Sequence, residues 1–550
     1  MVESISPRPA SRPPTYSGET SIRSTLEHLE AHLERQRDRE PNHPSEVTTP
    51  ALTPPPLPQA HAPPRGIPDL CKTLHDYEIV IQKSQWDHFM KVFCDEVHNL
   101  YPLLNLRDLW EQYALFWWDH ITSPSASRQL NRESRVSVSQ ILICLAIGRC
   151  TASPRIPGQG GRHSAGWSFY GAALELFGDF LDCFEECSNQ LILLQTLSLM
   201  VIYLFRLDIV SKAEKVLALA ISHAYHLGLH RSQAEIHRIG PSETEMFRRV
   251  WWCLYVLDRR LAIEGGHPFL ISDLDINTPL PRIPDAVCGG VPGPESTRPA
   301  SSSQPEVSSD LTPIPYIIAM AEYSRVVGKV WEAVYSAGTA TNPNPSLCDH
   351  LEDLILGVQK QIPPMFRYHP EAGPSAQPVT APWPLAKQQS LMQIRWLSLR
   401  VLIRKPMLQN SMSATSSELS TFENEAISLR IMKNVIEESV RLPAEQAVFT
   451  FPFFHDLLRA VLISLGLLIK EPAFRDQYRA VVFRGVRFLE AYCQKTWVSG
   501  KLIRIVAKLS QIVFRLFGAT DHREKGVVED FDWLYALFSD YLDPALIVFH

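Results

Sequence analysis

The strongest constraint on the fold is a helical hydrophobic period that resumes after every break in the chain from Tyr77 onward. In stretches such as SLMQIRWLSLRVLI (390–403) and LIRIVAKLSQIVFRLF (502–517), apolar residues recur three and four positions apart, which is the spacing of one helix face. The sequence shows no convincing period-two strand and no series of strands alternating with helices. We therefore expect an all-α protein, a large multi-helix body of antiparallel helical hairpins. With 550 residues, 45% of them hydrophobic, the chain can bury a large core.

Residues 1–70 have a different composition from the rest. They hold 14 of the 43 prolines and almost no apolar periodicity, so they cannot bury enough apolar surface to offset the entropy of ordering. We expect a disordered Pro-rich region, apart from a short coiled-coil-like helix at 21–39. Such a short helix is marginal alone, and it is either a transient amphipathic helix or the seam of a weak homo- or heterodimer. The seam residues are Ile22, Leu26, Leu29 and Leu33.

The helical domain is expected to span residues 77–550. Three stretches dominated by Pro, Gly, Ser or Thr interrupt it, at 284–310, 370–384 and 410–420, and we interpret them as flexible inserted loops.

Two helix starts inside this domain carry the Ser-x-x-Glu pattern of a capping box, in which serine and glutamate satisfy each other's backbone N–H groups. The pattern occurs at 211–214 and at 242–245. The ends of the same two helices are marked by glycine, at Gly228 and at Gly265-Gly266, because the backbone after a helix often adopts a positive φ.

Charge and hydropathy exclude several functional classes. The net charge of −6 and the pI of about 6.4 give no global attraction to nucleic acid or to an anionic membrane. The N-terminus lacks the apolar core of a signal peptide, and the longest apolar run, 191–205, is too short to span a bilayer and is interrupted by Gln195. We expect a soluble intracellular protein with reduced thiols and no membrane partner.

Residue types that could bind a metal do occur, but without ligand spacing. His223, His226 and His230 share a helix edge, yet no H-E-x-x-H is present and Gly228 is expected to end the helix before His230. No C-x2-C pair occurs. We therefore expect no metal ligands among these residues.

Catalytic motifs are also missing from the sequence, which contains no phosphate-binding loop, no dinucleotide fingerprint and no nucleophile elbow. We expect no catalytic residues and no enzyme activity, although catalytic groups can converge from distant positions.

The stretch FRRVWWCLYVLDRR (247–260) places Asp258 in the middle of an apolar helix face. Trp252 and Val256 lie on the opposite side of that helix. They stand between one edge that carries Arg248 and Arg259 and a second edge that carries Arg249 and Arg260. We therefore expect a central helix that is contacted on most sides.

An unpaired carboxylate in such a helix would cost several kcal/mol. We expect Asp258 to be a buried structural acid that receives hydrogen bonds from an arginine of a neighbouring helix or from N–H groups of the Gly265-Gly266 loop. Alternatively, Asp258 lines a pocket walled by Trp251, Trp252 and Tyr255, and the protein is an all-helical small-molecule-binding protein or an enzyme.

The segment PFLISDLDINTPLPRIP follows this helix and is predicted to lie extended over the helical body. We interpret Asp273 and Asp275 as ties of that loop and not as a catalytic carboxylate pair.

The runs AISHAYHLGLHR and ETEMFRRVWWCLYVLDRRLAIEGGHPFLISDLDINTPLP resemble the middle homology region of the fungal zinc-cluster transcription factors. A weaker likeness extends over about 77–470, and His267 stands where that family usually has arginine. The resemblance implies a helical regulatory domain, with a core at about 77–345 and a C-terminal helical part at about 346–550. Its motif residues are expected to be structural or regulatory; they are Gly228, His230, Arg248, Arg249, Trp251, Trp252, Tyr255, Asp258, Arg259, Gly266, Pro268, Asp273, Asp275 and Pro281.

Members of that family bind DNA through six cysteines, in two C-x2-C-x6-C halves, that hold two zinc ions. The present sequence has no cysteine before Cys71. We therefore expect no cofactor in the sequence given, and zinc only if an upstream exon encodes the cluster. DNA would be reached through that missing cluster or through an intact heterodimer partner bound at 21–39.

The resemblance thus implies a nuclear transcriptional regulator that senses a signal and contacts other transcriptional regulators. It would control a metabolic pathway or a biosynthetic cluster, and a small-molecule effector is expected among its partners. An interaction scaffold without a nuclear function is an alternative from a different class.

Overall fold

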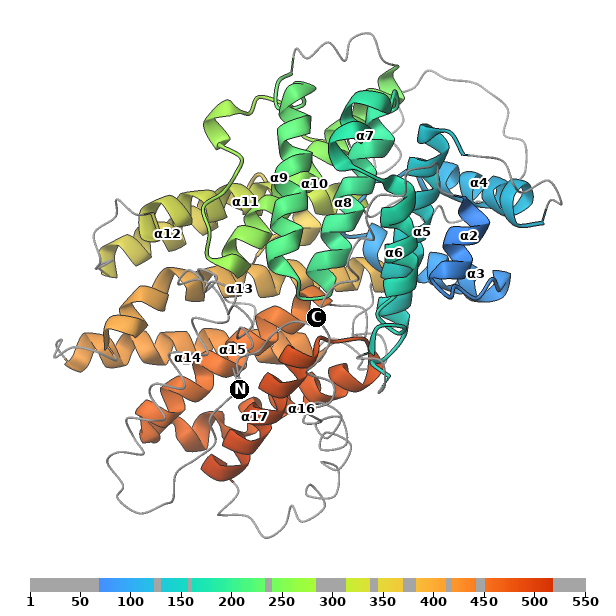
Figure 1. Ribbon diagram of the computed structural model, residues 1–550. Coiled ribbons are helices and arrows are strands. Elements are labelled where there is room, and N and C mark those ends of the chain that lie inside the picture. Colours follow the sequence, from blue (N-terminus) through green and yellow to red (C-terminus); the bar gives the residue numbers. More distant parts are fainter. Residues whose placement is uncertain are drawn as a thin grey trace, which may run out of the picture.

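The computed structural model describes residues 69–122, 130–156, 161–232, 240–282, 313–336, 345–368, 382–411, 418–441 and 451–517. Every regular element in these ranges is a helix, which confirms the all-α prediction (Figure 1). The predicted helix at 21–39 with its seam Ile22, Leu26, Leu29 and Leu33 lies outside the described residues, as do the predicted loop 284–310 and most of the other two.

The first helices form the right-hand side of Figure 1. The long helix α5 is the central element there, and it packs against α3, α6 and α8. Because α2 starts at Leu70, the helical body begins earlier than the predicted Tyr77. The bounds are α2 (Leu70–Asp76), α3 (Lys83–Val92), the π-helical η1 (Phe93–His98), α4 (Leu106–Phe116), the π-helical η2 (Trp117–Thr122), α5 (Arg132–Ala152), α6 (Trp167–Phe177) and α7 (Phe180–Glu186).

The middle of the chain forms the upper part of the body, in green and yellow. Here α10 packs against α8, α9 and α11, so that it is covered on several sides. The bounds are α8 (Gln190–Arg206), α9 (Val210–His226), α10 (Pro241–Gly265), the short 3-10 turn η5 (Asp273–Asp275), α11 (Pro313–Val334), α12 (Pro345–Val358) and η8 (Pro364–Phe366).

The remaining helices form the lower part, in orange and red. Each contacts the next along the chain, and α13 and α14 lie side by side beneath α11 and α12. The bounds are α13 (Trp383–Ser411), α14 (Glu418–Arg441), α15 (Phe451–Lys470), η10 (Pro472–Phe474), α16 (Arg475–Lys495) and α17 (Gly500–Phe517).

Side-chain caps explain where several helices begin. The side chains of Asp69, Asn105, Asn131, Asp179 and Asn189 each accept a hydrogen bond from a backbone N–H in the first turn of the following helix. Each bond satisfies a donor that has no partner inside the helix.

The two predicted capping boxes are wrong. Helix α9 begins after Ile209 and α10 begins with Gly240 as N-cap and Pro241 in the first turn, so Ser211 and Ser242 lie inside the helices. Neither N-cap makes a side-chain hydrogen bond. A proline at the first helical position gives α10 a start without a cap, since its missing N–H would have been unpaired.

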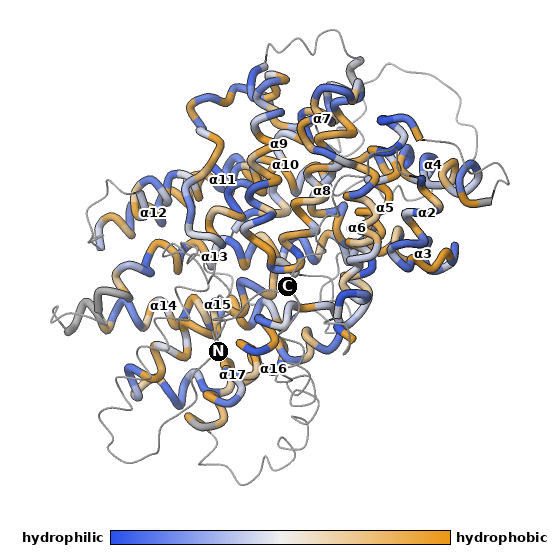
Figure 2. Tube along the Cα trace, viewed as in Figure 1, coloured by the Kyte–Doolittle hydropathy of each residue, from blue (hydrophilic) through white to orange (hydrophobic). Residues whose placement is uncertain are grey.

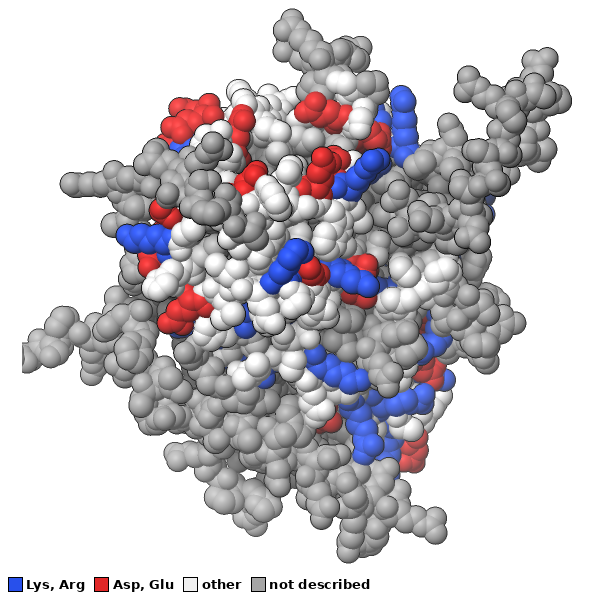
Figure 3. Space-filling view, turned by 90° about the vertical axis from the view of Figure 1, so that its right-hand side faces the viewer, with Lys and Arg blue, Asp and Glu red and all other residues white. Residues whose placement is uncertain are grey.

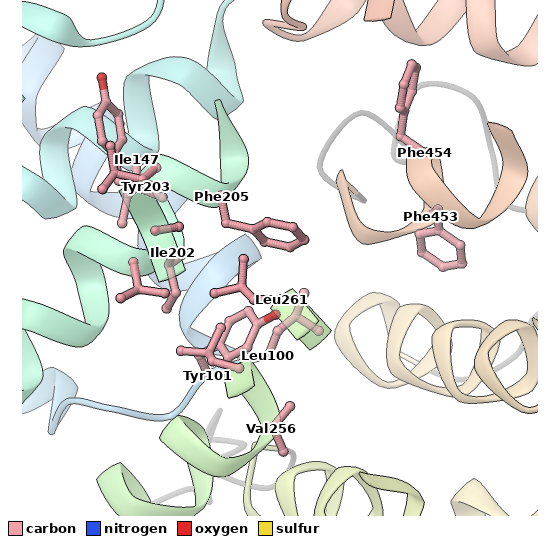
Figure 4. Close-up of a cluster of buried hydrophobic side chains, with 14 of the residues drawn as sticks. Leu100, Tyr101, Ile147, Ile202, Tyr203, Phe205, Val256, Leu261, Phe453 and Phe454 are labelled. Atoms are coloured by element: carbon pink, nitrogen blue, oxygen red, sulfur yellow. The ribbon is translucent and has the colours of Figure 1, made fainter. Parts of the chain in front are cut away.

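One apolar core cluster includes residues on both sides of the predicted boundary at 345/346. Figure 2 shows hydrophobic segments running along α8 and α15. Figure 4 shows buried side chains from α5, α8 and α10 together, with Phe205 of α8 directed toward the side on which Phe453 and Phe454 of α15 lie.

Two buried polar ties also cross from the first part of the body to the last. The Arg206 guanidinium donates to the backbone oxygen of Trp497 and to Oγ1 of Thr496, both at 2.7 Å. The Lys387 ammonium donates to Oε2 of Glu96 at 2.7 Å and to its backbone oxygen at 2.9 Å. These ties fix the C-terminal helices on the earlier ones.

The described residues contain one helix, α5, that is long and apolar enough to cross a membrane, but 78% of its apolar window is buried inside the fold. A central core helix has these same properties. On the face drawn in Figure 3, acidic and basic side chains are mixed in the upper part, and lysines and arginines gather in the lower part.

Candidate functional site

Helix α10 carries the candidate site, and its interior face is fully packed. Trp251, Trp252 and Tyr255 are buried, and Asp258 is 2% exposed. The indole ring of Trp251 contacts the rings of Tyr225 and His230, at centroid distances of 5.6 and 6.2 Å. The expectation of a central helix with a buried acid is therefore confirmed.

The Asp258 carboxylate joins α10 to the segment that follows it. Its Oδ1 accepts from the backbone N–H of Leu270 at 3.0 Å, and its Oδ2 accepts from the N–H of Ile271 at 3.1 Å. Arg259 donates to the same Oδ2 at 2.6 Å. The expected partners were thus wrong in detail, since the arginine is the next residue of the same helix and the N–H groups lie beyond the glycine pair.

Arg259 connects this carboxylate to a second one. Its Nη2 donates to Oδ1 of Asp273 at 2.5 Å, and the Tyr255 hydroxyl donates to the same oxygen at 2.8 Å. The guanidinium carbon lies 4.1 Å from the ring centre of Tyr255 and 4.6 Å from that of Phe269, which are cation–π distances. We call Tyr255, Asp258, Arg259 and Asp273 the clasp.

Further bonds hold residues 266–282, which we call the strap, along α10 and the turn that follows α9. Trp252 Nε1 donates to the backbone oxygen of Pro279 at 3.0 Å, and the N–H of Asn277 donates to the backbone oxygen of His230 at 3.0 Å. The N–H of Arg282 donates to Oε1 of Glu245 at 2.9 Å. The segment that was predicted to lie extended over the helical body is therefore held along it by a continuous series of hydrogen bonds.

Both glutamates of the predicted capping boxes bind this region. Glu245 holds Arg282 and pairs with Arg248 at 2.7 Å, whereas Glu214 binds the His267 ring at 2.9 Å. A Cβ at Gly265 would lie 2.5 Å from Oε1 of Glu214, so a larger residue there would displace this carboxylate.

Burial sets the electrostatics of the clasp. It raises the pKa of Asp258 above the ordinary value, while Arg259 and the N–H groups of Leu270 and Ile271 oppose that rise. Burial also raises the pKa of the Tyr255 hydroxyl, and Asp273 adds to that rise whereas Arg259 opposes it. The tyrosine therefore remains a neutral donor to Asp273.

The other residues of the predicted motif have different positions. Gly228 and Gly266 adopt φ of 74° and 71° and end α9 and α10. Arg249 lies near Glu245 at 3.7 Å, and Pro281 is buried. Pro268 and Asp275 are exposed, and of the two aspartates predicted to tie the loop only Asp273 joins the clasp.

We expect Gly266→Ala to lower the free energy of unfolding by about 1–2 kcal/mol, because an L side chain is disfavoured at positive φ. Gly357→Ala in α12 is the matched control, since a Cβ there meets open space and alanine favours the helix. Urea titration of both variants measures the effect. Equal stability of Gly266→Ala and the unmodified protein would show that the end of α10 does not need glycine.

A second polar cluster lies on the other edge of α10, and the sequence did not reveal it. Glu264, with a side chain 5% exposed, pairs with Arg459 at 3.1 Å, with His455 at 3.5 Å and with Arg260 at 3.6 Å. Asp456 pairs with Arg459 at 3.2 Å and with Arg260 at 3.7 Å. A charged residue inside an apolar run, as in FHDLLRAVL, is the signal that could have indicated it.

A cavity adjoins this second cluster, between α10, α11, α13 and α15, and it has room of about 40 Å³ for the centres of water-sized molecules. Trp251, Trp252, Tyr255 and Asp258 do not line it. This cavity therefore lies elsewhere than the alternative pocket expected around Trp251 and Asp258, whose side chains are engaged in packing and in the clasp.

The predicted histidine edge has packing contacts. A hydrogen bond of 2.5 Å joins Nε2 of His223 to Oε1 of Gln190, and the His223 ring stacks on Phe184. Burial lowers the pKa of His223 to about 4. In the described part of the chain, no group of three or more His, Cys, Asp and Glu side chains could hold a metal ion.

Comparison with known proteins gives a family match. Residues 90–347 match the fungal specific transcription factor domain, which includes α10 and the strap. Transcriptional activator protein acu-15 of Neurospora crassa is 24% identical over 254 residues, which are 46% of this chain and 26% of that protein.

Two further relatives have similar coverage. Probable transcription factor FUP6 of Fusarium proliferatum is 31% identical over 156 residues, 27% of this chain and 20% of that protein. Terreic acid cluster-specific transcription factor atF of Aspergillus terreus is 23% identical over 201 residues, 36% of this chain and 28% of that protein. The chain therefore spans between 20% and 28% of the length of these three relatives.

Proposed function

Because the chain carries a fungal specific transcription factor domain at residues 90–347, we propose that the protein is a nuclear transcriptional regulator that acts through its helical body. The match over that domain is the observation that carries the proposal. The names of the relatives support it, since they describe a transcriptional activator, a transcription factor and a regulator of a biosynthetic cluster. A metabolic pathway or a biosynthetic cluster is the proposed target.

The clasp supports action by contact and not by catalysis. Both carboxylates of the clasp are already bonded: Asp258 accepts from two N–H groups and from Arg259, and Asp273 accepts from Arg259 and Tyr255. A catalytic acid, base or nucleophile needs to reach a substrate atom. The clasp instead fixes the strap as part of a rigid surface for other regulatory proteins.

DNA contact is proposed to come from a six-cysteine zinc cluster encoded upstream, or from an intact partner that pairs through residues 21–39. Mapping the 5′ end of the transcript distinguishes these routes. An in-frame cluster supports direct contact with DNA, and co-purification with a relative that carries a cluster supports the partner route.

Tethering tests the regulatory role without knowledge of the target genes. The full chain is fused to a heterologous DNA-binding domain, and transcription is measured from one weak and one strong promoter that carry its operator. We expect the fusion to change transcription several-fold from one of them, relative to the DNA-binding domain alone. A fusion that is nuclear and abundant but leaves both promoters unchanged would contradict the proposed function.

A further inference from the structure

The cavity beside the second polar cluster has an unequal charge balance. Its charged lining from the helices around it comprises Arg259, Arg260, Glu264, Arg395, Asp456 and Arg459. The Arg259 guanidinium already pairs with Asp258 and Asp273 of the clasp. Glu264 and Asp456 each pair with both Arg260 and Arg459, so these two cations and two anions balance each other.

Arg395 of α13 is the cation that remains. It is 4% exposed, it lines the cavity, and among the described residues no carboxylate forms an ion pair with its guanidinium. Asp456 attracts it from beyond ion-pair distance, but this carboxylate already pairs with Arg260 and Arg459. Its Nε has no hydrogen-bond partner in this part of the chain. Arginine stays protonated at physiological pH, so a full positive charge faces the cavity.

Buried cations are normally paired, and buried donors are normally hydrogen-bonded. Water in the cavity could satisfy the donors of Arg395, but the three cations Arg260, Arg395 and Arg459 would still exceed the two anions Glu264 and Asp456. A bound anion would both accept these hydrogen bonds and compensate the excess charge.

The remaining lining limits what that anion can be. Met320 and Val327 of α11 and Leu399 and Leu402 of α13 form an apolar wall. The cavity has room for about three water molecules. This space and wall suit a carboxylate with a single methyl group, of about the size of acetate.

We infer that the cavity between α10, α11, α13 and α15 binds a small aliphatic monocarboxylate, with the carboxylate on Arg395 and the methyl group against the apolar wall. The role of this ligand as a regulatory signal rests on the proposed function, whereas its binding does not. The site adjoins Glu264 and Arg260 of α10, so occupancy reaches the helix that also carries the clasp.

The test uses the full chain and fluoroacetate, whose fluorine resonance reports binding directly. We expect the line to broaden with protein and to be restored by unlabelled acetate but not by acetamide, its neutral isostere. Arg395→Met removes the charge at similar length and should weaken binding about ten-fold or more, as for loss of a charged hydrogen-bonded partner. Arg395→Lys should retain part of the binding.

Arg400→Met is the matched control on the same helix, because its guanidinium bonds Tyr368 and Glu352 outside the cavity lining. Melting curves should show Arg395→Met to be at least as stable as the unmodified protein, since it removes an unpaired buried cation.

Absence of broadening with the unmodified protein, or equal broadening with Arg395→Met, would overturn the inference and leave water as the occupant. Tethered transcription is measured separately, so its failure beside intact binding would refute only the proposed function.

Discussion

Replacing Asp258 by alanine is expected to lower the free energy of unfolding by about 3–5 kcal/mol, because it leaves the buried Arg259 with Asp273 as its one remaining carboxylate partner among the described residues. It also removes the acceptor of the Leu270 and Ile271 N–H groups, of which Ile271 is buried. The melting temperature should fall by roughly 3–6 °C, and soluble yield should fall with it. Differential scanning calorimetry of the full chain measures the change.

Asp275→Ala is the matched control, since this acid lies on the same strap but is exposed and outside the clasp. Its melting temperature should stay close to that of the unmodified protein. A fully stable Asp258→Ala protein that no longer responds to an effector would show that the acid is a ligand group and that the structural role proposed for it is wrong.

The second large effect is expected for Glu264→Ala, which should also cost about 3–5 kcal/mol. The substitution removes the carboxylate that pairs with Arg260 and Arg459 and leaves both cations in the interior with Asp456 alone. Glu111→Ala in α4 is the control, because Glu111 is exposed and a surface substitution changes stability little. If both variants unfold at the same urea concentration, the cluster contributes nothing to stability.

The same carboxylate predicts a pH dependence. Burial alone would raise the pKa of Glu264, but Arg459, His455 and Arg260 outweigh it and hold the pKa well below the ordinary range. The stabilisation is therefore complete above the unfolded pKa of about 4.3 and is lost as the pH falls toward the lower folded value.

The difference in stability between the unmodified protein and Glu264→Gln should thus be constant near neutral pH and should shrink below about pH 4.3. Urea titrations over this range measure it. A difference that stays constant to the lowest pH at which the protein folds would show that Glu264 is not stabilised as an anion.

Local features of this fold could be predicted from the sequence. The apolar period predicted α13 and α17, and glycine predicted the ends of α9 and α10, since both signals depend on residues a few positions apart. The burial of Asp258 followed from its place on an apolar face. The helix start at Ser211 was wrong because α9 begins without a side-chain cap, which leaves little trace in sequence. The start at Ser242 was wrong because Pro241, the residue before it, already lies in the first turn of α10.

The contacts that define the site depend on residues far apart in the chain, which periodicity cannot pair. Glu264 meets Arg459, 195 residues later, and the sequence shows each only as a charge next to apolar residues. Arg395 likewise faces the cavity only because α11 and α15 surround it. Within the clasp, Arg259 was expected on a helix edge, but its bond to Asp273 depends on the path of the strap.

Hydrogen exchange of residues 266–282, followed by mass spectrometry in the full chain, tests most directly whether the clasp fixes the strap on α10. We predict that the amides of Leu270 and Ile271 are protected in the unmodified protein, and that Asp258→Ala exposes the strap while α8 keeps its protection. Exchange of the strap at the rate of an unstructured peptide in the unmodified protein would contradict this account.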